Sequence, residues 1–380
     1  MTREAYLDPF DRIVVKIGSA LVADNRGTLR RSWIKTIAAD VAALRGHGKD
    51  VIIVSSGAIA LGSAALGFAG RPNRLDEAQA AACAGQITLM NAYRKTLEEH
   101  GHHIGQLLLT LSDLDGRRSY LNARATLQTL LSRGIIPIIN ENDATATEEI
   151  RVGDNDRLAA RVAQMIDADL LILLSDVDGL YTANPATHQM ADHIADIPAI
   201  SPDILALADT PDPAAMSRGG MLTKLQAGQI VTQSGCDMII MDGKAEAPLR
   251  RLAQGERHSR FHASSEGRSD ARRRWLAGQL GAQGAICVDI GAQKALETGK
   301  SLLAAGITRT QGPFTRGDVI KLLAPDGAPV GLGLSNYDSA EIDQIRGLKS
   351  DDIAQKLGYT RSQTVVHRDN LVLKAEGTKQ

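Results

Sequence analysis

Short apolar runs separated by longer helical patterns constrain the fold of this chain more than any other feature. Such runs, for example "RIVVKI" and "ADLLILLSD", begin at residues 12, 50, 104, 134, 168 and 236. Continuous apolar runs of this kind are typical of strands covered on both faces. Between them, residues 31–48 and 76–101 are Ala-rich, carry apolar residues at helical spacing and end in Gly, which predicts helices.

This alternation predicts an α/β domain whose mainly parallel sheet is sandwiched by helices, with ligand sites at the carboxyl ends of its strands. The chain has 380 residues, more than one hydrophobic core usually supports, so we expect a second domain. Residues 1–256 carry the alternation and form the expected first domain. Residues 257–282 are polar and Arg-rich, which favours a solvated linker over a nucleic-acid-binding arm.

After this expected linker the pattern changes to short apolar stretches separated by Gly. Residues 283–365 contain such stretches with turn signals such as "PDG", which predicts a second, small, mostly antiparallel β domain. The segment "SQTVVHRDNLVL", residues 362–373, can add one more strand, and residues 366–380 form the expected C-terminal tail.

Charge and composition argue against several functional classes. A formal net charge of −1 gives no field that would attract nucleic acid or an anionic membrane, and 3% aromatic residues are too few for a base-stacking platform. The N-terminal segment has no apolar signal region and no apolar run is long enough to span a membrane, so we expect a cytoplasmic protein. The three cysteines form no CxxC pattern, which favours buried apolar positions over metal or disulfide sites.

Small polar residues follow two of the predicted strands. Lys16 lies within the first run, Gly18 and Ser19 come directly after it, and Ser56 and Gly57 follow the second run. Small residues with accessible N–H groups before a helix can form an anion site, although such turns can also be purely structural. Because a lysine stands beside them, they predict an anionic ligand at this edge of the sheet.

An acidic stretch follows another predicted strand. "NENDATATEEIRVGDND" runs from Asn140 to Asp156, directly after the apolar run at residue 134. A solvated loop is the ordinary explanation for so many carboxylates. The alternative is a ligand site, because the end of a buried parallel strand is where α/β folds bind ligands.

A second lysine stands out in "SRGGMLTKLQAG". Gly219 and Gly220 permit close approach of the backbone to a ligand, and the following residues predict a helix with Lys224 in its first turn. A cation is mildly unfavourable at this positive end of the helix dipole unless an anion docks there. An ordinary surface lysine is the alternative.

Several segments resemble the glutamate 5-kinase branch of the amino-acid kinase family. In chain order they are "KIGSALV", "VSSGAIALG", "YLNARATLQTLL", "PIINENDATAT", "VGDND", "LLSDVDGLYTANP" and "GGMLTK". "NENDATAT" together with "VGDND" is specific to this branch, whereas "LLSD" is shared more widely. The segments "GAICVDIGAQKAL", "GKSLLAAGI" and "FTRGDVI" resemble a PUA domain, so the resemblance covers nearly the whole chain.

The resemblance implies phosphoryl transfer from ATP to the γ-carboxylate of L-glutamate, which gives L-glutamyl 5-phosphate in the first step of proline biosynthesis. Mg²⁺ is expected to bind mainly through the ATP phosphates. The substrate carboxylate, with a pKa of about 4.3, is already ionised at neutral pH, so no general base is required. Cations and oriented N–H donors are what such a transfer needs.

The resemblance also assigns roles to individual residues. As catalytic groups, Lys16 and Lys224 flank the transferred phosphoryl group and Asp156 organises both lysines. The glutamate site is Ser56, Gly57, Asp143, Asp154 and Asn155. In it, Asp143 accepts from the substrate ammonium, while Ser56 and Asn155 donate to the substrate carboxylates. The ATP site is Lys16, Gly18, Ser175, Asp176, Arg218, Gly219, Gly220, Met221, Leu222, Thr223 and Lys224.

Two positions depart from the family pattern. Ser175 stands where Thr is common, which keeps the hydroxyl, and Ser217–Arg218 stands where Gly-Thr is common, which leaves the contacts of that loop open. The family further implies a dimer or tetramer, a partner glutamyl-5-phosphate reductase, and feedback inhibition by proline, with residues 144–152 as the responding loop. The alternatives are a related kinase of acetylglutamate, aspartate or UMP, and an RNA-binding regulator acting through the PUA-like domain.

Overall fold

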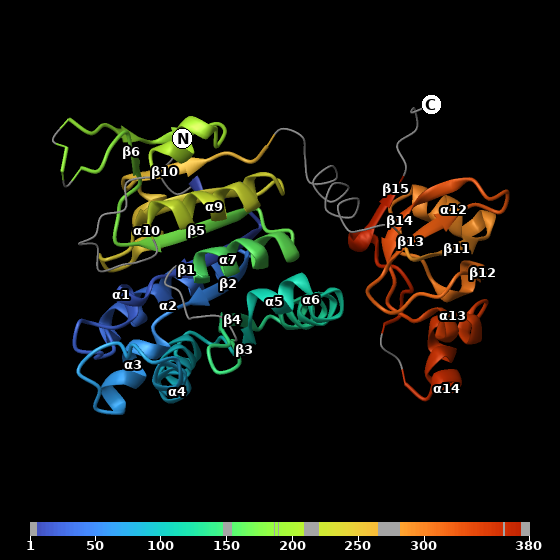
Figure 1. Cartoon of the computed structure of the whole chain (residues 1–380), viewed down its shortest axis with the longest axis horizontal. Coiled ribbons are helices and arrows are strands. Elements are labelled where there is room, and N and C mark those ends of the chain that lie inside the picture. The colour runs from blue at the N-terminus through green and yellow to red at the C-terminus, as the bar shows by residue number, and fades with distance from the viewer. Residues whose placement is uncertain are drawn as a thin grey trace. The chain divides into compact units, whose positions relative to one another are not determined.

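The computed structural model divides the chain into two units, which we describe separately. Unit 1 spans Met1–Gly267 and unit 2 spans Arg268–Gln380. The structure describes residues 6–146, 154–185, 187–188, 190–208, 220–264, 282–359 and 362–373. Each unit has its own sheet and its own helices (Figure 1).

An eight-stranded sheet forms the centre of unit 1, in the order β3-β4-β2-β1-β5-β9-β10-β8. Its strands are β1 (Arg12–Ile17), β2 (Asp50–Ser55), β3 (Ile104–Leu109), β4 (Ile136–Glu141), β5 (Leu170–Ser175), β8 (Asp196–Ile197), β9 (Asp237–Asp242) and β10 (His258–Phe261). All neighbours from β3 across to β9 are parallel, and only the β9–β10 pair is antiparallel. The predicted mainly parallel sheet is therefore confirmed. A separate two-stranded sheet joins β6 (Leu180–Tyr181) to β7 (His193–Ile194).

Helices cover both faces of this sheet. One face packs against α2 (Arg31–Gly46), α4 (Leu75–Glu98) and α10 (Pro248–Ala253). The other packs against α6 (Arg117–Ser132), α7 (Asp154–Met165) and α9 (Met221–Thr232). The shorter helices are α1 (Ser19–Val22), α3 (Ala58–Ala65), α5 (Leu111–Asp115) and α8 (Pro202–Ala206). No helix in the described part of the chain is long and apolar enough to cross a membrane.

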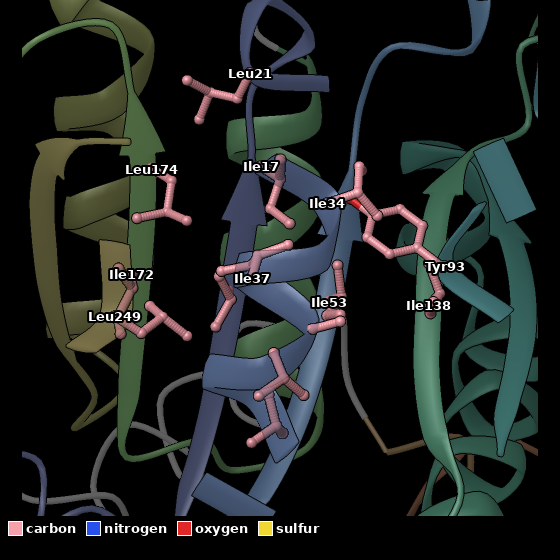
Figure 2. Close-up of a cluster of buried hydrophobic side chains, with 14 of the residues drawn as sticks. Ile17, Leu21, Ile34, Ile37, Ile53, Tyr93, Ile138, Ile172, Leu174 and Leu249 are labelled. Carbon is pink, nitrogen blue, oxygen red and sulfur yellow. The ribbon is translucent and has the colours of Figure 1, made fainter. Parts of the chain in front are cut away.

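Successive residues of the central strands enter different cores. In β1, Val15 and Ile17 pack with the α2 face, whereas Val14 packs with the α7 face. Figure 2 shows the α2 face, where Ile17 of β1 and Ile53 of β2 lie beside Ile37 of α2. This burial on both sides explains why the strands lack polar alternation.

Two expectations of burial were wrong. Strand β3 is the outermost strand of the sheet and is only partly covered, with Leu108 39% exposed. An outermost strand has a partner on one side only, so an apolar run is not enough to predict full burial. Cys236 and Cys287 are buried as expected, but Cys83 is exposed on α4.

Strand β10 lies in the segment that we expected to be linker. Ser259 and Phe261 are buried, and Arg260 between them pairs with Asp237 of β9 at 2.7 Å. The expectation was wrong here because only alternate residues of this short strand face the core, which hides it in an Arg-rich stretch. The other domain boundaries stay predictions, and most of the expected linker, residues 265–281, lies outside the described residues.

Unit 2 is built on a five-stranded sheet in the order β12-β11-β13-β14-β15. Its strands are β11 (Gly284–Val288), β12 (Ile307–Gln311), β13 (Val319–Leu323), β14 (Pro329–Leu334) and β15 (Leu371–Leu373), and its α-helices are α12 (Ile290–Glu297), α13 (Ser339–Ile345) and α14 (Ile353–Leu357). Only the β11–β13 pair is parallel, so the sheet is mostly antiparallel as predicted. The expected extra strand near the C-terminus is β15.

Candidate active site

The carboxyl ends of four neighbouring parallel strands of unit 1 line one cavity. Lys16 of β1, Ser56 after β2, Asn140 of β4 and Ser175 of β5 all line a cavity of about 420 Å³. These strands are neighbours in a parallel sheet, so their carboxyl ends meet at one edge. The position agrees with the general rule for ligand sites in α/β sheets.

A buried carboxylate joins the two predicted lysines. Asp156, in the first turn of α7, is 1% exposed and has Lys16 Nζ 2.6 Å from its Oδ1 and Lys224 Nζ 3.1 Å from its Oδ2. Thr223 Oγ1 also donates to Oδ2, at 3.3 Å. We call Lys16, Asp156 and Lys224 the lysine cluster. The structure thus brings together the three residues predicted to be catalytic.

Burial and the charges of its neighbours shift the pKa values of Lys16 and Asp156 in the lysine cluster. Burial lowers the pKa of Lys16, and the nearby Lys224 adds to this effect while Asp156 opposes it. Burial alone would raise the pKa of Asp156, but the attraction of Lys16 and Lys224 outweighs it and lowers the pKa to about 2. Two ammonium groups that line the same cavity favour binding of an anion there.

A second group of polar side chains lines the same cavity. Asn155 Nδ2 donates to Ser56 Oγ at 2.9 Å and to Asn140 Oδ1 at 3.2 Å. Asp143 is 7% exposed and also lines the cavity. Asp154 begins α7, but its side chain lies outside the described residues. Ser56, Asp143 and Asn155 of the predicted glutamate site therefore share one cavity.

The predicted ATP site is described in part. Ser175 Oγ donates to Asp176 Oδ1 at 3.1 Å, and both residues line the cavity. Gly220 precedes α9, whose first turn contains Met221, Leu222 and Thr223. Arg218 and Gly219 lie outside the described residues. Lys244, which the sequence did not single out, donates from Nζ to the Asp176 carbonyl at 2.7 Å.

Two predicted glycines differ in what the structure asks of them. Gly57 has φ +108°, and a Cβ there would come within 3.1 Å of Val22, so both conformation and space require glycine. Gly18 donates its N–H to the Leu174 carbonyl at 3.3 Å. That N–H is therefore directed at the backbone of β5, and a Cβ at Gly18 would make only ordinary contacts, at 3.5 Å from the Leu174 carbonyl and 4.0 Å from Lys16 Nζ.

The cavity extends to two loops that sequence reasoning missed. Residues 24–27 and 68–71 line it and contribute Asn25, Arg26, Phe68 and Arg71. These loops carry no apolar periodicity and no phosphate-binding motif, so only their position in the fold brings them to the site. Asn140 was part of the quoted acidic stretch but was assigned no role.

Comparison with known proteins identifies the family. The amino acid kinase family model matches residues 11–242. Glutamate 5-kinase 1 of Rhizobium meliloti is 50% identical to the chain over 369 residues, which cover 97% of this chain and 93% of that protein. The chain belongs to the glutamate 5-kinase family.

Two further members of this family are equally similar. A glutamate 5-kinase of Agrobacterium fabrum is 51% identical over 368 residues, covering 97% of this chain and 94% of that protein. One of Brucella ovis is 49% identical over 369 residues, covering 97% of both. The PUA domain model matches residues 284–357, so unit 2 contains a PUA domain as predicted. The chain is a kinase, and its family implies ATP as the phosphoryl donor.

Proposed function

We propose that the chain transfers the γ-phosphoryl group of ATP to the γ-carboxylate of L-glutamate. One observation carries this proposal. The lysine cluster, which suits a polyphosphate, opens into the same cavity as Ser56, Asp143 and Asn155, which suit an amino acid. The names of the relatives favour glutamate over acetylglutamate, aspartate or UMP as the acceptor, and a kinase over an RNA-binding regulator.

The lysine cluster supplies the electrostatic part of the reaction. A γ-carboxylate oxygen of glutamate forms a bond to the γ-phosphorus, while the bond to the β,γ-bridging oxygen breaks and ADP leaves with the electron pair. Lys16 and Lys224 stabilise negative charge on the transferring group and the leaving group. Asp156 holds the two ammonium groups in place. The acceptor is ionised at neutral pH, so no side chain has to remove a proton.

Mg²⁺ belongs to the substrate in this proposal. The described part of the chain contains no group of three His, Cys, Asp or Glu side chains arranged to hold a metal ion. Mg²⁺ often binds through substrate phosphates with few protein ligands, so we expect it to enter as the MgATP complex. Adding Mg²⁺ in excess over ATP is then expected to leave the rate unchanged after ATP is saturated with the ion.

Trapping the product with hydroxylamine tests the function directly. The acyl phosphate of glutamate reacts with hydroxylamine to give a coloured hydroxamate, which we expect to depend on both ATP and L-glutamate. Acetylglutamate, aspartate and UMP in place of glutamate, with release of ADP as a common readout, separate the related kinases. If the protein turns over any of these three compounds but does not turn over glutamate, the proposal is rejected.

Three finer proposals follow from the family. The first is that proline is a feedback inhibitor that acts through residues 144–152. The second is that a glutamyl-5-phosphate reductase consumes the labile product. The third is that the chain assembles as a dimer or tetramer in the cytoplasm. In the described part of this loop, Gln79 Nε2 donates to the Ala146 carbonyl at 3.2 Å, while residues 147–152 lie outside the described residues. Substitutions in 144–152 are expected to change proline inhibition. Noncompetitive inhibition that none of them alters would count against this role.

A further inference from the structure

A chain of side-chain hydrogen bonds ends at the substrate cavity. Asn140 Nδ2 donates to Gln86 Oε1 of α4 at 2.9 Å, and Asn155 Nδ2 donates to Asn140 Oδ1 at 3.2 Å and to Ser56 Oγ at 2.9 Å. We call Gln86, Asn140, Asn155 and Ser56 the amide chain. It joins α4, β4, α7 and the end of β2, and three of its members line the cavity.

A backbone group fixes the direction of the amide chain. The N–H of Glu141 donates to Asn140 Oδ1 at 2.9 Å. Side-chain amides are often ambiguous because oxygen and nitrogen can be exchanged by rotation, but a backbone N–H can only donate. Asn140 must therefore turn its oxygen toward Glu141 N–H. Because Asn140 is 3% exposed, the wrong orientation would bury an unmatched donor pair.

The orientation of Asn140 determines that of Asn155. Asn140 Oδ1 is an acceptor, so Asn155 has to turn its NH₂ group toward it, and the second proton of that NH₂ goes to Ser56 Oγ. Both protons of the Asn155 amide are then used. Its Oδ1 is buried and has no hydrogen-bond partner among the described residues. Asn155 lines the cavity, so a ligand can supply the missing donor.

We propose that Asn140 sets the polarity of the substrate site, so that Asn155 Oδ1 accepts a hydrogen bond from the α-ammonium group of the substrate. This inference rests on the proposed function and reverses the sequence-based expectation that Asn155 donates to a carboxylate. Asn140 is a positioning residue in this scheme. Ser56 Oγ already accepts from Asn155, so its own proton is the one that donates to a substrate carboxylate.

The chemistry of the ligand fits this polarity. An ammonium group has three donor protons, and Asp143 alone cannot satisfy them all in a closed site. Asn155 Oδ1 adds a neutral acceptor, which the acidic stretch supplies without a second charge. A hydrogen bond to a charged group is worth about ten- to a hundredfold in affinity when its partner would otherwise be left buried. The site should therefore discriminate strongly against a dicarboxylate without an amino group.

Ligands that lack one group each test the assignment. Glutarate lacks the α-ammonium of glutamate, and 4-aminobutyrate lacks the α-carboxylate. The hydroxamate assay gives the KM for L-glutamate and the competitive inhibition constants of both analogues. For Asn155→Ala we expect the glutamate KM and the 4-aminobutyrate constant to rise about ten- to a hundredfold. The glutarate constant should change by no more than about twofold, because that ligand has no ammonium to lose.

Variants of Asn140 separate positioning from packing. Asn140→Leu removes the acceptor, so Asn155 can reverse, and the preference for glutamate over glutarate should fall as in Asn155→Ala. Asn140→Asp keeps an oxygen toward Glu141 N–H and Asn155 Nδ2, and should retain most of that preference. A purely structural role of Asn140 would weaken glutamate and glutarate equally in both variants, which would overturn the inference.

Ser56→Ala is the matched control in the same amide chain. The substrate carboxylate that Ser56 is expected to bind is present on both glutamate and glutarate. The glutamate KM and the glutarate inhibition constant should therefore rise by the same factor, so their ratio should stay unchanged. Equal losses for glutamate and glutarate in Asn155→Ala would overturn the inference while leaving the kinase activity of the wild type intact. A wild type that forms no glutamyl hydroxamate would instead reject the proposed function.

Discussion

The lysine cluster and the amide chain face one cavity but are held in place by different physics. In the lysine cluster, charges hold one another, with Asp156 2.6 Å from Lys16 Nζ and 3.1 Å from Lys224 Nζ. In the amide chain, neutral groups are oriented by one backbone N–H, that of Glu141. The lysine cluster therefore supplies positive charge, and the amide chain supplies hydrogen-bonding groups of fixed orientation. We expect the first to act on the transition state and the second on recognition of the bound substrate.

Two consecutive residues of α7 belong to these two regions, Asn155 to the amide chain and Asp156 to the lysine cluster. Asn155 contacts Ser56 after β2 and Asn140 of β4, whereas Asp156 contacts Lys16 of β1 and Lys224 of α9. Neighbouring residues on a helix point about 100° apart, so adjacent positions can serve two sides of one cavity. The first turn of α7 is also where the helix dipole stabilises a carboxylate, which favours Asp156 at this position. Substitutions at the two residues should therefore give different kinetic signatures.

Asp156→Asn should have the largest effect. The substitution keeps the shape but leaves two ammonium groups without their shared carboxylate in a buried place. We expect kcat to fall by about 10³-fold or more, because both lysines lose the carboxylate that holds them in place. The rate of ADP release at saturating concentrations of both substrates measures kcat. Asp76→Asn, which breaks an exposed pair with Arg74, is the control and should change kcat by less than about twofold.

Lys224→Ala should follow. The ammonium of Lys224 is expected to act mainly on the transition state, so kcat should fall by about 10²- to 10³-fold while the glutamate KM changes by only a few-fold. Steady-state kinetics with varied glutamate separates the two constants. Lys35→Ala, at an exposed position of α2, should behave like the wild type. A nearly normal kcat for Lys224→Ala would place the lysine cluster outside the chemistry.

The acid stability of the protein should report the lysine cluster. The pKa of Asp156 is lowered to about 2 in the folded state and lies near 3.9 in an unfolded chain. Its contribution of about 2 to 3 kcal/mol is therefore complete above about pH 5 and is lost progressively as the pH falls from there toward 2. We expect the difference in Tm between the wild type and Asp156→Asn to be constant between pH 7 and 5 and to shrink below pH 4. A difference that grows in acid would contradict the charged state assigned to Asp156.

The sequence predicted the lysine cluster better than the amide chain. Lys16 follows from a cation inside an apolar run, and Lys224 from a cation in the first turn of a helix after two glycines. Both break a local rule, and residues that break a local rule are often functional. Asp156 was assigned through the resemblance to the family. These three residues come together because β1, α7 and α9 are neighbours in a parallel α/β unit.

The amide chain could not be derived from spacing in the sequence. Gln86 sits in a long Ala-rich helix where a single amide gives no signal, and it lies 54 positions from Asn140. The direction of Asn155 depends on the Glu141 N–H, which is a backbone position and has no sequence signature. The sheet itself was predictable because apolar runs report burial, whereas the partial exposure of β3 at the edge and the presence of β10 in an Arg-rich segment were not. Hydrophobic patterns in the sequence therefore predicted most helices and strands, whereas the orientation of the polar groups depends on the folded structure.

Asp143→Ala should weaken recognition rather than chemistry. Asp143 is buried, lines the same cavity as the amide chain and is the predicted partner of the substrate ammonium. We expect the glutamate KM to rise by about tenfold or more, with the ATP KM nearly unchanged, because a charge-assisted hydrogen bond is lost. Kinetics with each substrate varied in turn measures both constants. An unchanged glutamate KM would remove Asp143 from the substrate site.

Tyr93→Phe should have the smallest effect, and it tests whether Tyr93 of α4 helps to hold Ser56 of the amide chain in place. Tyr93 Oη lies 2.9 Å from Ser55 Oγ, and burial raises the pKa of Tyr93, so the phenol keeps its proton. Ser55 Oγ also donates to the Ser56 carbonyl at 3.1 Å, and Ser56 N–H donates to the Ile17 carbonyl at 3.0 Å. The turn that carries Ser56 is thus held without Tyr93. We expect a loss of about 1 kcal/mol in unfolding free energy and less than a twofold change in glutamate KM. A larger change in KM would mean that the position of Ser56 depends on α4 through Tyr93 as well as on the backbone of β1.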